Sequence, residues 1–342
     1  MTTQTHPVLQ LSSLRAYFEK AGIPMDGDLR ASLITGGKSN LTFLVTDNSS
    51  RWVLRRPPTA GLTPSAHDVA REFRVIAALQ GTGVPVAPAI ALCEDPSVLG
   101  APFSVVGFVA GSAIQTRQDL SALTDAQVET CVDELVRALA GLHQVDHTSA
   151  GLGGFGRSEG YLSRQVAIWA NQWQRVKTQD SSDLDQLHAL LADSVPSESR
   201  VALVHGDFRI DNTILSGDYA AVNAVVDWEM STIGDPLADA ALMCVYRNPA
   251  LDLALGQSAA WTSPRLPSAA ALAERYAHAA DRDLPHWSFY VALANFKVAV
   301  IAQGINHRYE AGATVGEGFD RAGEAVPEFI AAGLRAMRSN HA

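Results

Sequence analysis

The feature that most constrains the fold of this chain is a change in the spacing of its apolar residues near position 110. Before that position, apolar residues occur in short runs separated by turn-forming pairs such as Asp47-Asn48. After it, they recur every third or fourth residue over long stretches, as between Val128 and Leu142. Short runs indicate strands, whereas the wider spacing marks one face of a helix. The sequence therefore predicts an α+β chain of two lobes, residues 1–110 and 111–342.

The first of these lobes should be a small antiparallel sheet with one helix packed on it. The helix is expected between Val69 and Leu79, with Ser65 as its cap, because apolar residues there share one face and Gly81 follows. The expected strands cover residues 33–34, 41–45, 52–54, 89–93 and 103–109. The second lobe should be mainly helical, apart from short strands at 201–204, 213–215 and 221–226.

Charge and cysteine content exclude several classes of partner. The formal net charge of −10 argues against nucleic acid, because proteins that bind it present basic patches to the phosphates. The three cysteines form no CxxC pair, and the first residues lack the basic and apolar pattern of a secretory leader. The uncharged stretch 96–116 is broken by glycines and prolines, which favours strands and turns over a membrane span. We therefore expect a cytoplasmic protein without a membrane or nucleic-acid partner, and its oligomeric state is not fixed by the sequence.

Three polar side chains occupy the ends of the short strands expected in the second lobe. Asp207 follows the first strand, Asn212 comes five residues later, and Asp227 ends the last strand. Phosphoryl transfer needs an aspartate that orients an acceptor hydroxyl and takes its proton, together with hard oxygen ligands for magnesium. Asp207 suits the first role, and Asn212 and Asp227 suit the second. Kinases have the same order of catalytic-loop Asp, Asn five positions on and separate metal-binding Asp.

Other interpretations of these residues are simpler. Each could serve as a helix cap or a turn residue, and His205 is expected to brace the loop through a hydrogen bond. Asp239, one turn into the next expected helix, is expected to anchor the same loop. A metal-dependent phosphohydrolase that uses His205, Asp207 and Asp227 is a further alternative, although this set is thin for two metal ions.

Polar residues of the first lobe fit a nucleotide site. Gly37, Ser39 and Asn40 lie in a turn between two expected strands, where backbone N–H groups could close over phosphates. Arg55 at the end of a strand and Glu72 on the following helix have the order of a strand cation and a helix carboxylate that position phosphates. An ordinary hairpin turn and a surface ion pair are the alternatives.

Two long motifs resemble those of the aminoglycoside phosphotransferase and choline kinase superfamily. They are HGDFRIDN at residues 205–212 and VVDWEMSTIGDPLADAAL at residues 225–242. Four shorter motifs are similar to the branch that also occurs fused to acyl-CoA dehydrogenases, namely GGKSNLTF, VLRRPP, GYLSRQVAIWANQW and AQGINHR. The resemblance extends over nearly the whole chain.

That resemblance implies a protein-kinase-like bilobal fold and an enzyme that uses ATP and magnesium. The small N-terminal lobe would bind the nucleotide, with the adenine near Val106 and Val109. The larger helical lobe would carry Asp207 as the catalytic base and would bind the acceptor. Asn212 and Asp227 would hold magnesium.

One departure from the superfamily bears on activity. Arg55 stands where much of the superfamily has a lysine, and a planar guanidinium is not interchangeable with an ammonium. A nucleotide-binding module without catalysis is therefore the alternative to an active kinase. The motif GDPLAD follows Asp227 almost at once, so an activation segment of the protein-kinase kind is missing and a protein substrate is not expected.

Candidates for acceptor binding lie on two expected helices of the second lobe. Tyr161, Arg164 and Trp169 share one helix and Gln303 lies on another, although core packing is an alternative role for all of them. The leading interpretation is an ATP- and magnesium-dependent kinase that phosphorylates a hydroxyl of a small molecule. The branch resemblance favours a hydroxylated acyl-type metabolite, whereas the superfamily favours a sugar or an aminoglycoside.

Overall fold

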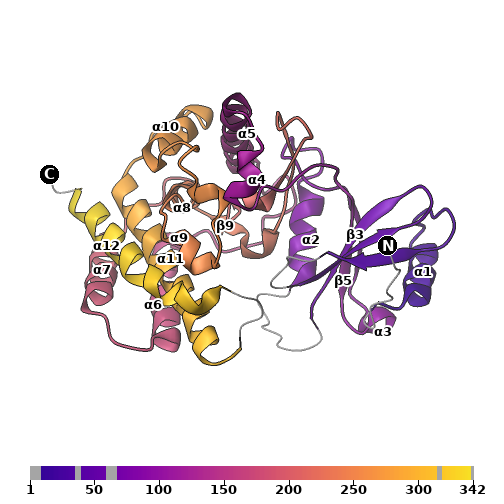
Figure 1. Ribbon diagram of the computed structural model, residues 1–342, viewed down its shortest axis with the longest axis horizontal. Coiled ribbons are helices and arrows are strands. Elements are labelled where there is room, and N and C mark those ends of the chain that lie inside the picture. The colour runs from indigo at the N-terminus through magenta and orange to yellow at the C-terminus, as the bar shows by residue number, and fades with distance from the viewer. Residues whose placement is uncertain (1–8, 35–39, 59–67, 314–317, 340–342) are drawn as a thin grey trace. The chain divides into compact units, whose positions relative to one another are not determined.

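The computed structural model describes residues 9–34, 40–58, 68–313 and 318–339 (Figure 1). The chain divides into two compact units. The first unit comprises Met1–Gly111 and Asn223–Ser231, and the second comprises Ser112–Val222 and Thr232–Ala342. The sequence predicts every residue after 110 in the second lobe, whereas the structure groups Asn223–Ser231 with the first unit.

The first unit is built on one antiparallel sheet of five strands in the order β1-β2-β3-β5-β4. These strands are β1 (Arg30–Leu33), β2 (Leu41–Thr46), β3 (Arg51–Arg56), β4 (Ala89–Cys93) and β5 (Phe103–Gly107), and a short helix α3 (Pro96–Leu99) lies between the last two in sequence. Alternate residues of β2 and β3 are buried, and Phe43 lies opposite Leu54. Helix α1 (Leu11–Lys20) adds to the same core, because its Phe18 packs edge-on against Trp52 with ring centroids 5.3 Å apart. A strand is present at each of the five predicted places, although β1 covers residues 30–33 where 33–34 were predicted and β5 ends at Gly107 instead of residue 109.

Helix α2 (Val69–Ala78) packs against β4 and β5 of this sheet. It begins after Asp68, whose carboxylate accepts a hydrogen bond from the backbone N–H of Arg71 at 2.9 Å. Asp68 is therefore the cap in place of the predicted Ser65, which lies outside the described residues. Glu72 lies on the buried face of the helix, where an ionised carboxylate requires a partner.

The segment Asn223–Ser231 joins the first unit through non-local hydrogen bonds. The backbone N–H of Val225 donates to the carbonyl of Pro85 at 2.8 Å, and the guanidinium of Arg71 donates to the carbonyl of Ser231 at 2.9 Å. The elements of this region are β8 (Val222–Val225) and the 3-10 helix η2 (Trp228–Met230). The predicted metal-binding aspartate that follows β8 thus belongs to the same unit as α2.

The second unit is mainly helical, as predicted. Its α-helices are α4 (Arg117–Ser121), α5 (Asp125–Gln144), α6 (Tyr161–Val176), α7 (Ser182–Asp193), α8 (Pro236–Val245), α9 (Leu251–Leu255), α10 (Ala269–Ala279), α11 (Trp287–Glu310) and α12 (Ala325–Arg338). The 3-10 helices are η1 (Ile210–Asn212), η3 (Ala260–Thr262) and η4 (Phe319–Glu324). Among its short strands, β6 (Ala202–Val204) pairs antiparallel with β9 (Thr232–Gly234), and β7 (Thr213–Leu215) follows η1. The loop between β6 and η1 carries the motif HGD.

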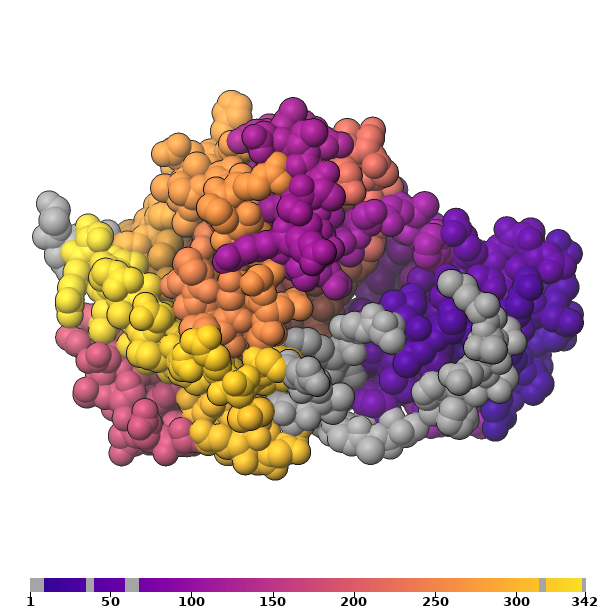
Figure 2. Space-filling model, in the orientation of Figure 1, coloured from indigo at the N-terminus to yellow at the C-terminus, as the bar shows by residue number. Residues whose placement is uncertain are grey.

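Helix α11 is the central helix of the second unit, where it packs against α6, α7, α8 and α12. It is long and apolar enough to cross a membrane, but 72% of its most apolar stretch is buried inside the structure. Such burial is typical of the core helix of a globular domain. By contrast, α12 (yellow) and α5 (magenta) contribute to the visible surface of the second unit (Figure 2).

Candidate active site

The loop between β6 and η1 is held by a buried carboxylate. Asp239 on α8 accepts hydrogen bonds from the backbone N–H of His205 at 2.6 Å and of Gly206 at 2.8 Å. Nδ1 of His205 accepts another from the backbone N–H of Asp207 at 3.2 Å. Gly206 has a φ of +81°, a left-handed conformation that glycine adopts readily because it has no Cβ. Asp239 therefore anchors the loop and His205 braces it, as predicted.

Asp239 has a further partner on the side opposite the loop. Its Oδ2 lies 3.2 Å from Nε2 of His143, and Nδ1 of His143 lies 2.7 Å from the hydroxyl of Tyr276. Burial favours the neutral acid, but the hydrogen bond and charge of His143, together with the backbone N–H of His205, outweigh it and hold the pKa of Asp239 below its ordinary value. Helices α5, α8 and α10 thus fix the anchor of the loop.

Asp207 has hydrogen-bond partners on both oxygens of its carboxylate. Oδ1 accepts from the hydroxyl of Tyr246 at 2.6 Å, and Oδ2 accepts from Nδ2 of Asn212 at 3.0 Å. Nδ2 of Asn212 also donates to the main-chain carbonyl of Asp207 at 2.8 Å. Because the amide nitrogen of Asn212 is used in this way, its amide oxygen is the atom left for a cation. The structure therefore brings two of the predicted residues together.

Tyr246 and Arg209 complete the surroundings of Asp207. The guanidinium of Arg209 lies 3.5 Å from Oδ2 of Asp207 and 5.2 Å from the ring centroid of Tyr246. Burial, and then the charge of Asp207, raise the pKa of Tyr246 well above its ordinary value, so its hydroxyl keeps the proton that it donates. Sequence reasoning did not select either residue.

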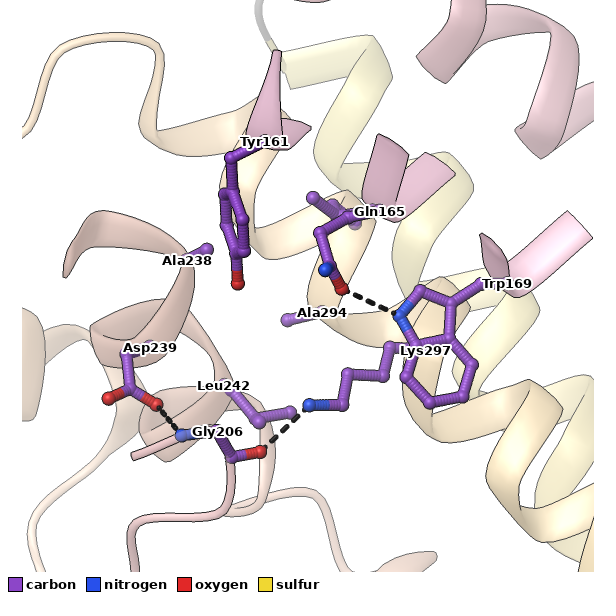
Figure 3. A pocket seen from close by; sticks show the side chains of 10 residues that line it. Tyr161, Gln165, Trp169, Gly206, Ala238, Asp239, Leu242, Ala294 and Lys297 are labelled. Atoms are coloured by element: carbon purple, nitrogen blue, oxygen red, sulfur yellow. Dashed lines mark hydrogen bonds between the residues drawn. The ribbon is translucent and has the colours of Figure 1, made fainter. Parts of the chain in front are cut away.

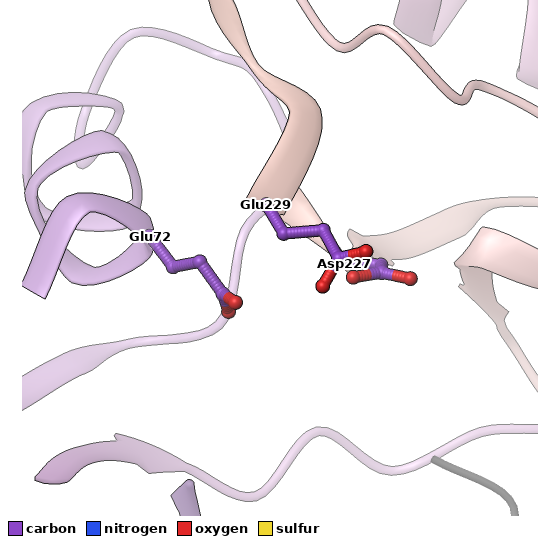
Figure 4. Close-up of side chains that lie close together, drawn as sticks. All are labelled: Glu72, Asp227 and Glu229. Carbon is purple, nitrogen blue, oxygen red and sulfur yellow. The ribbon is translucent and has the colours of Figure 1, made fainter. Parts of the chain in front are cut away.

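A second group of predicted residues lies together in the first unit. Nη1 of Arg55 forms an ion pair with Oε2 of Glu72 at 2.7 Å, and Nη2 lies 3.8 Å from Oδ1 of Asp227. Carboxylate oxygens of Glu72, Asp227 and Glu229 all lie within 4.8 Å of one another (Figure 4). Nδ2 of Asn40 donates to Oε1 of Glu72 at 3.3 Å. Hard oxygen atoms so close together, beside one guanidinium, are suited to a divalent cation such as magnesium.

The carboxyl group of Glu72 has an unusually high proton affinity. Burial is the main cause, because it disfavours the charged carboxylate. The positive charge of Arg55 lowers the pKa, and the negative charges of Asp227 and Glu229 raise it. Together these effects raise the pKa of Glu72 from an ordinary value of 4.5 to about 7. The folded protein therefore binds a proton at this site more tightly than the unfolded chain does.

This raised pKa predicts a pH-dependent cost of ionising Glu72. The stability that the protonated carboxyl contributes is fully present below pH 4.5 and is lost as the pH rises to about 7. In the metal-free protein, the unfolding free energy of Glu72→Gln relative to wild type should therefore increase by about 3 kcal/mol across that window. Urea denaturation at several pH values measures the difference. Glu19→Gln, at an exposed position on α1, is the matched control, and a difference that does not change with pH would contradict the assignment.

A small pocket in the second unit lies beside Gly206 (Figure 3). Its volume is about 20 Å³. The residues that line it are Tyr161, Gln165, Trp169, Gly206, Ala238, Asp239, Leu242, Leu293, Ala294 and Lys297. Nζ of Lys297 on α11 donates to the carbonyl of Gly206 at 2.8 Å and lies 5.5 Å from the ring centroid of Trp169. Tyr161 packs closely there because Gly234 has no side chain: a Cβ would lie 2.6 Å from Cε2 of the ring.

The predicted acceptor-binding residues divide into two groups. Tyr161 and Trp169 line this pocket. Arg164, on the same helix, instead donates to the backbone carbonyls of Arg157 and Glu159. Gln303 is buried, and its Nε2 donates to the carbonyl of Val176 at 3.0 Å. The hydrogen bonds of Arg164 and Gln303 are those of structural residues.

The remaining predicted nucleotide residues belong to the first unit. Val106 lies on β5 opposite Val53 of β3, and Val109 follows β5; both are half-buried. Gly37 and Ser39 lie outside the described residues. The roles assigned to these four positions and to Asn40 therefore stay predictions.

Lys297 is the pocket residue that sequence reasoning missed. It is the only Lys or Arg between Trp287 and Asn306, in a helix that is otherwise apolar there. A lone cation on such a helix is costly to bury and is a signal that could have been used. The partner that it contacts is 91 residues away in the chain, which no local pattern reveals.

Comparison with known proteins identifies the family. The model of the phosphotransferase enzyme family APH matches residues 30–290. The chain belongs to this family. Membership confirms the predicted superfamily and the prediction of a phosphotransferase enzyme.

Individual relatives agree with this assignment. Mouse acyl-CoA dehydrogenase family member 11 is 35% identical over 308 residues, which cover 87% of this chain and 39% of the mouse protein. The chain thus spans about two fifths of the length of that relative. A crystal structure of a Ralstonia eutropha protein, assigned to the aminoglycoside phosphotransferases, is 30% identical, with a TM-score of 0.82 and coverage of 96% of this chain and 98% of that chain.

The kinase-like fold extends to more distant structures. An aminoglycoside phosphotransferase solved with ADP and hygromycin B is 15% identical and has a TM-score of 0.60, with coverage of 96% of this chain and 98% of that chain. Identity at this level supports the fold alone. These neighbours confirm the predicted fold class, an α+β protein-kinase-like fold with a small antiparallel sheet and a larger helical part.

Proposed function

We propose that this family member transfers the γ-phosphate of ATP, as its magnesium complex, to a hydroxyl group of a small molecule. The observation that carries the proposal is the carboxylate of Asp207. It stands on a loop anchored by Asp239, and the Asn212 amide and the Tyr246 hydroxyl both donate to it. A side chain fixed in this way keeps one orientation, as a group that receives a proton in a transition state must.

In this proposal Asp207 orients the acceptor hydroxyl and takes its proton. The hydroxyl oxygen then forms a bond to the γ-phosphorus while the bond between that phosphorus and the bridging oxygen of ADP breaks. Tyr246 and Asn212 hold Asp207 toward the acceptor and disperse its charge. Arg55, held by Glu72, is the cation for the phosphates.

Asn212 and Asp227 are the proposed magnesium ligands. Oδ1 of Asp227 is buried and accepts no hydrogen bond from any residue that the structure describes, which suits a metal ligand. The amide oxygen of Asn212 is a second hard donor. Magnesium bound by such groups neutralises charge on the phosphates. Glu72 and Glu229 lie beside Asp227 as further carboxylates.

The acceptor and the location are also proposals. A hydroxylated acyl-type metabolite is suggested by the acyl-CoA dehydrogenase relatives, and a sugar or aminoglycoside-like compound by the name of the solved neighbours. All three cysteines are free and buried, which suits a reducing, cytoplasmic setting.

A screen of hydroxylated compounds tests the proposal. Sugars, aminoglycosides, amino alcohols and hydroxyacyl thioesters are incubated with the protein and ATP, and ADP and phosphorylated product are measured with magnesium and with excess EDTA. We expect product for at least one class with magnesium only. Binding of Mg-ATP by calorimetry without product from any class would instead favour the nucleotide-binding module that lacks catalysis.

A further inference from the structure

The carboxylate, amide and carbonyl oxygens of Asp239, Gln165 and Gly206 around the small pocket of the second unit all accept hydrogen bonds within the protein. Oε1 of Gln165 accepts from the indole N–H of Trp169 at 3.1 Å. The carbonyl of Gly206 accepts from Nζ of Lys297, and the two oxygens of Asp239 accept from backbone N–H groups of the loop. Among the residues that line the pocket, the hydroxyl oxygen of Tyr161 is the side-chain acceptor that takes no hydrogen bond from the described residues.

The donors of the same pocket are not used up. An ammonium has three N–H groups, and Lys297 makes one hydrogen bond to the described residues. Nε2 of Gln165 and the hydroxyl of Tyr161 donate to none of the residues that the structure describes. Figure 3 shows these three groups pointing into the pocket from α6 and α11.

One acidic and one basic side chain line the pocket, Asp239 and Lys297. The oxygens of Asp239 are hydrogen-bonded to two backbone N–H groups, and Oδ2 also lies beside His143, whereas the ammonium of Lys297 keeps N–H groups for a ligand. Burial holds the pKa of Lys297 below its ordinary value, and the carboxylates of Asp207 and Asp239 limit that shift. Burial and the negative charge of Asp239 raise the pKa of Tyr161, so its hydroxyl remains a donor.

We infer that this pocket binds the carboxylate of the acceptor, so that the acceptor is a hydroxy acid and not a cationic amino sugar. The inference rests on the proposed function and narrows its substrate class. A carboxylate is acceptor-only and complements Lys297, Gln165 and Tyr161. An ammonium would meet the like charge of Lys297 and, of the oxygens named above, would find only the hydroxyl of Tyr161 without a donor.

The size and position of the pocket agree with this assignment. A volume of about 20 Å³ has room for a group little larger than one water molecule, so it takes the end of a ligand and not a sugar ring. Nζ of Lys297 donates a hydrogen bond to the carbonyl of Gly206, the residue before Asp207. A carboxylate on Lys297 therefore leaves a hydroxyl of the same small molecule within reach of the proposed base.

Binding measurements with three matched sets of compounds test the inference. The sets are hydroxybutyrates with the hydroxyl at carbon 2, 3 or 4, butanediols, and amino alcohols of the same carbon skeleton. We expect calorimetry to give at least about tenfold tighter binding for the best hydroxybutyrate than for its diol, and none for the amino alcohol. Lys297→Met should abolish this preference, whereas Lys177→Met, which removes a lysine from the end of α6, should keep it.

A second variant keeps the test decisive if Lys297→Met does not fold. Gln165→Glu leaves the bond between Lys297 and Gly206 in place and adds a negative acceptor to the pocket. We expect it to weaken hydroxybutyrate binding by about tenfold or more and to admit the amino alcohol.

Several outcomes would overturn the inference. They are equal or tighter binding of amino alcohols to wild type, no binding of any hydroxybutyrate, or an unchanged preference in the variants. A loss of Mg-ADP affinity in Lys297→Met without added acceptor would instead assign the pocket to a nucleotide phosphate. If hydroxybutyrates bind as expected but none is phosphorylated in the presence of Mg-ATP, the pocket assignment stands and the proposed activity fails.

Discussion

Replacement of Asp207 by asparagine is expected to lower the rate of phosphate transfer by about a thousandfold while Mg-ATP still binds. Asparagine has the same shape but cannot take the proton of the acceptor hydroxyl. The hydroxyl of Tyr246, which donates to Asp207, can rotate and accept from the new amide, so the loop should keep its conformation. Single-turnover product formation measures the chemical step, and calorimetry measures nucleotide affinity.

The control for this substitution is Asp218→Asn, in the exposed turn after β7. It removes a carboxylate whose hydrogen bonds are to Ser216 and Ala220 and not to the loop, and its rate should stay within about twofold of wild type. Undiminished phosphate transfer by Asp207→Asn would remove Asp207 from the role of base.

Replacement of Asp239 by alanine is expected to be the most destabilising of the substitutions considered. It leaves the backbone N–H groups of His205 and Gly206 without their partner and deprives His143 of its carboxylate. Loss of several partners at a buried site should reduce the free energy of unfolding by about 3–5 kcal/mol. Urea denaturation gives this value, and hydrogen exchange at Gly206 reports whether the loop opens.

The pH dependence gives an independent check on Asp239. Its pKa is depressed in the folded protein from an ordinary 3.8, so its stabilisation is present above that pH and is lost as the pH falls below it. The free energy of unfolding of Asp239→Ala should therefore approach that of wild type only in strong acid. Asp193→Ala at the exposed end of α7 is the control, and a loss for Asp239→Ala no greater than for this control would contradict the anchoring role.

Local patterns were sufficient for the elements of the fold and for the loop around Asp207. The strands of the first unit are short apolar runs between turn residues, and in β2 and β3 alternate residues are buried, so these strands can be recognised from the local sequence. Asp207 lies in the loop before η1 and Asn212 at the end of η1, five residues later, so the contact between them is local and can be read from the sequence. Asp68 took the cap predicted for Ser65, because several polar residues near a helix start can each serve and only the backbone path selects among them.

Contacts between distant parts of the chain were not predictable in the same way. The hydrogen bonds that join the segment after residue 222 to the first unit connect residues more than a hundred positions apart, as between Arg71 and Ser231. The bond from Lys297 to Gly206 is of the same kind. The spacing of apolar residues shows which face of a helix or strand is buried, but it does not show which other element packs against that face.

The grouping of Asn223–Ser231 with the first unit has a consequence for how the protein can be made or cut. A fragment ending at residue 110 would lack the donor to Pro85, the acceptor for Arg71 and the carboxylate of Asp227. During translation, the sheet-containing unit cannot complete these contacts until residue 231 has left the ribosome, after α4 to α7 have already emerged. The smaller unit is therefore finished late, although its sequence comes first.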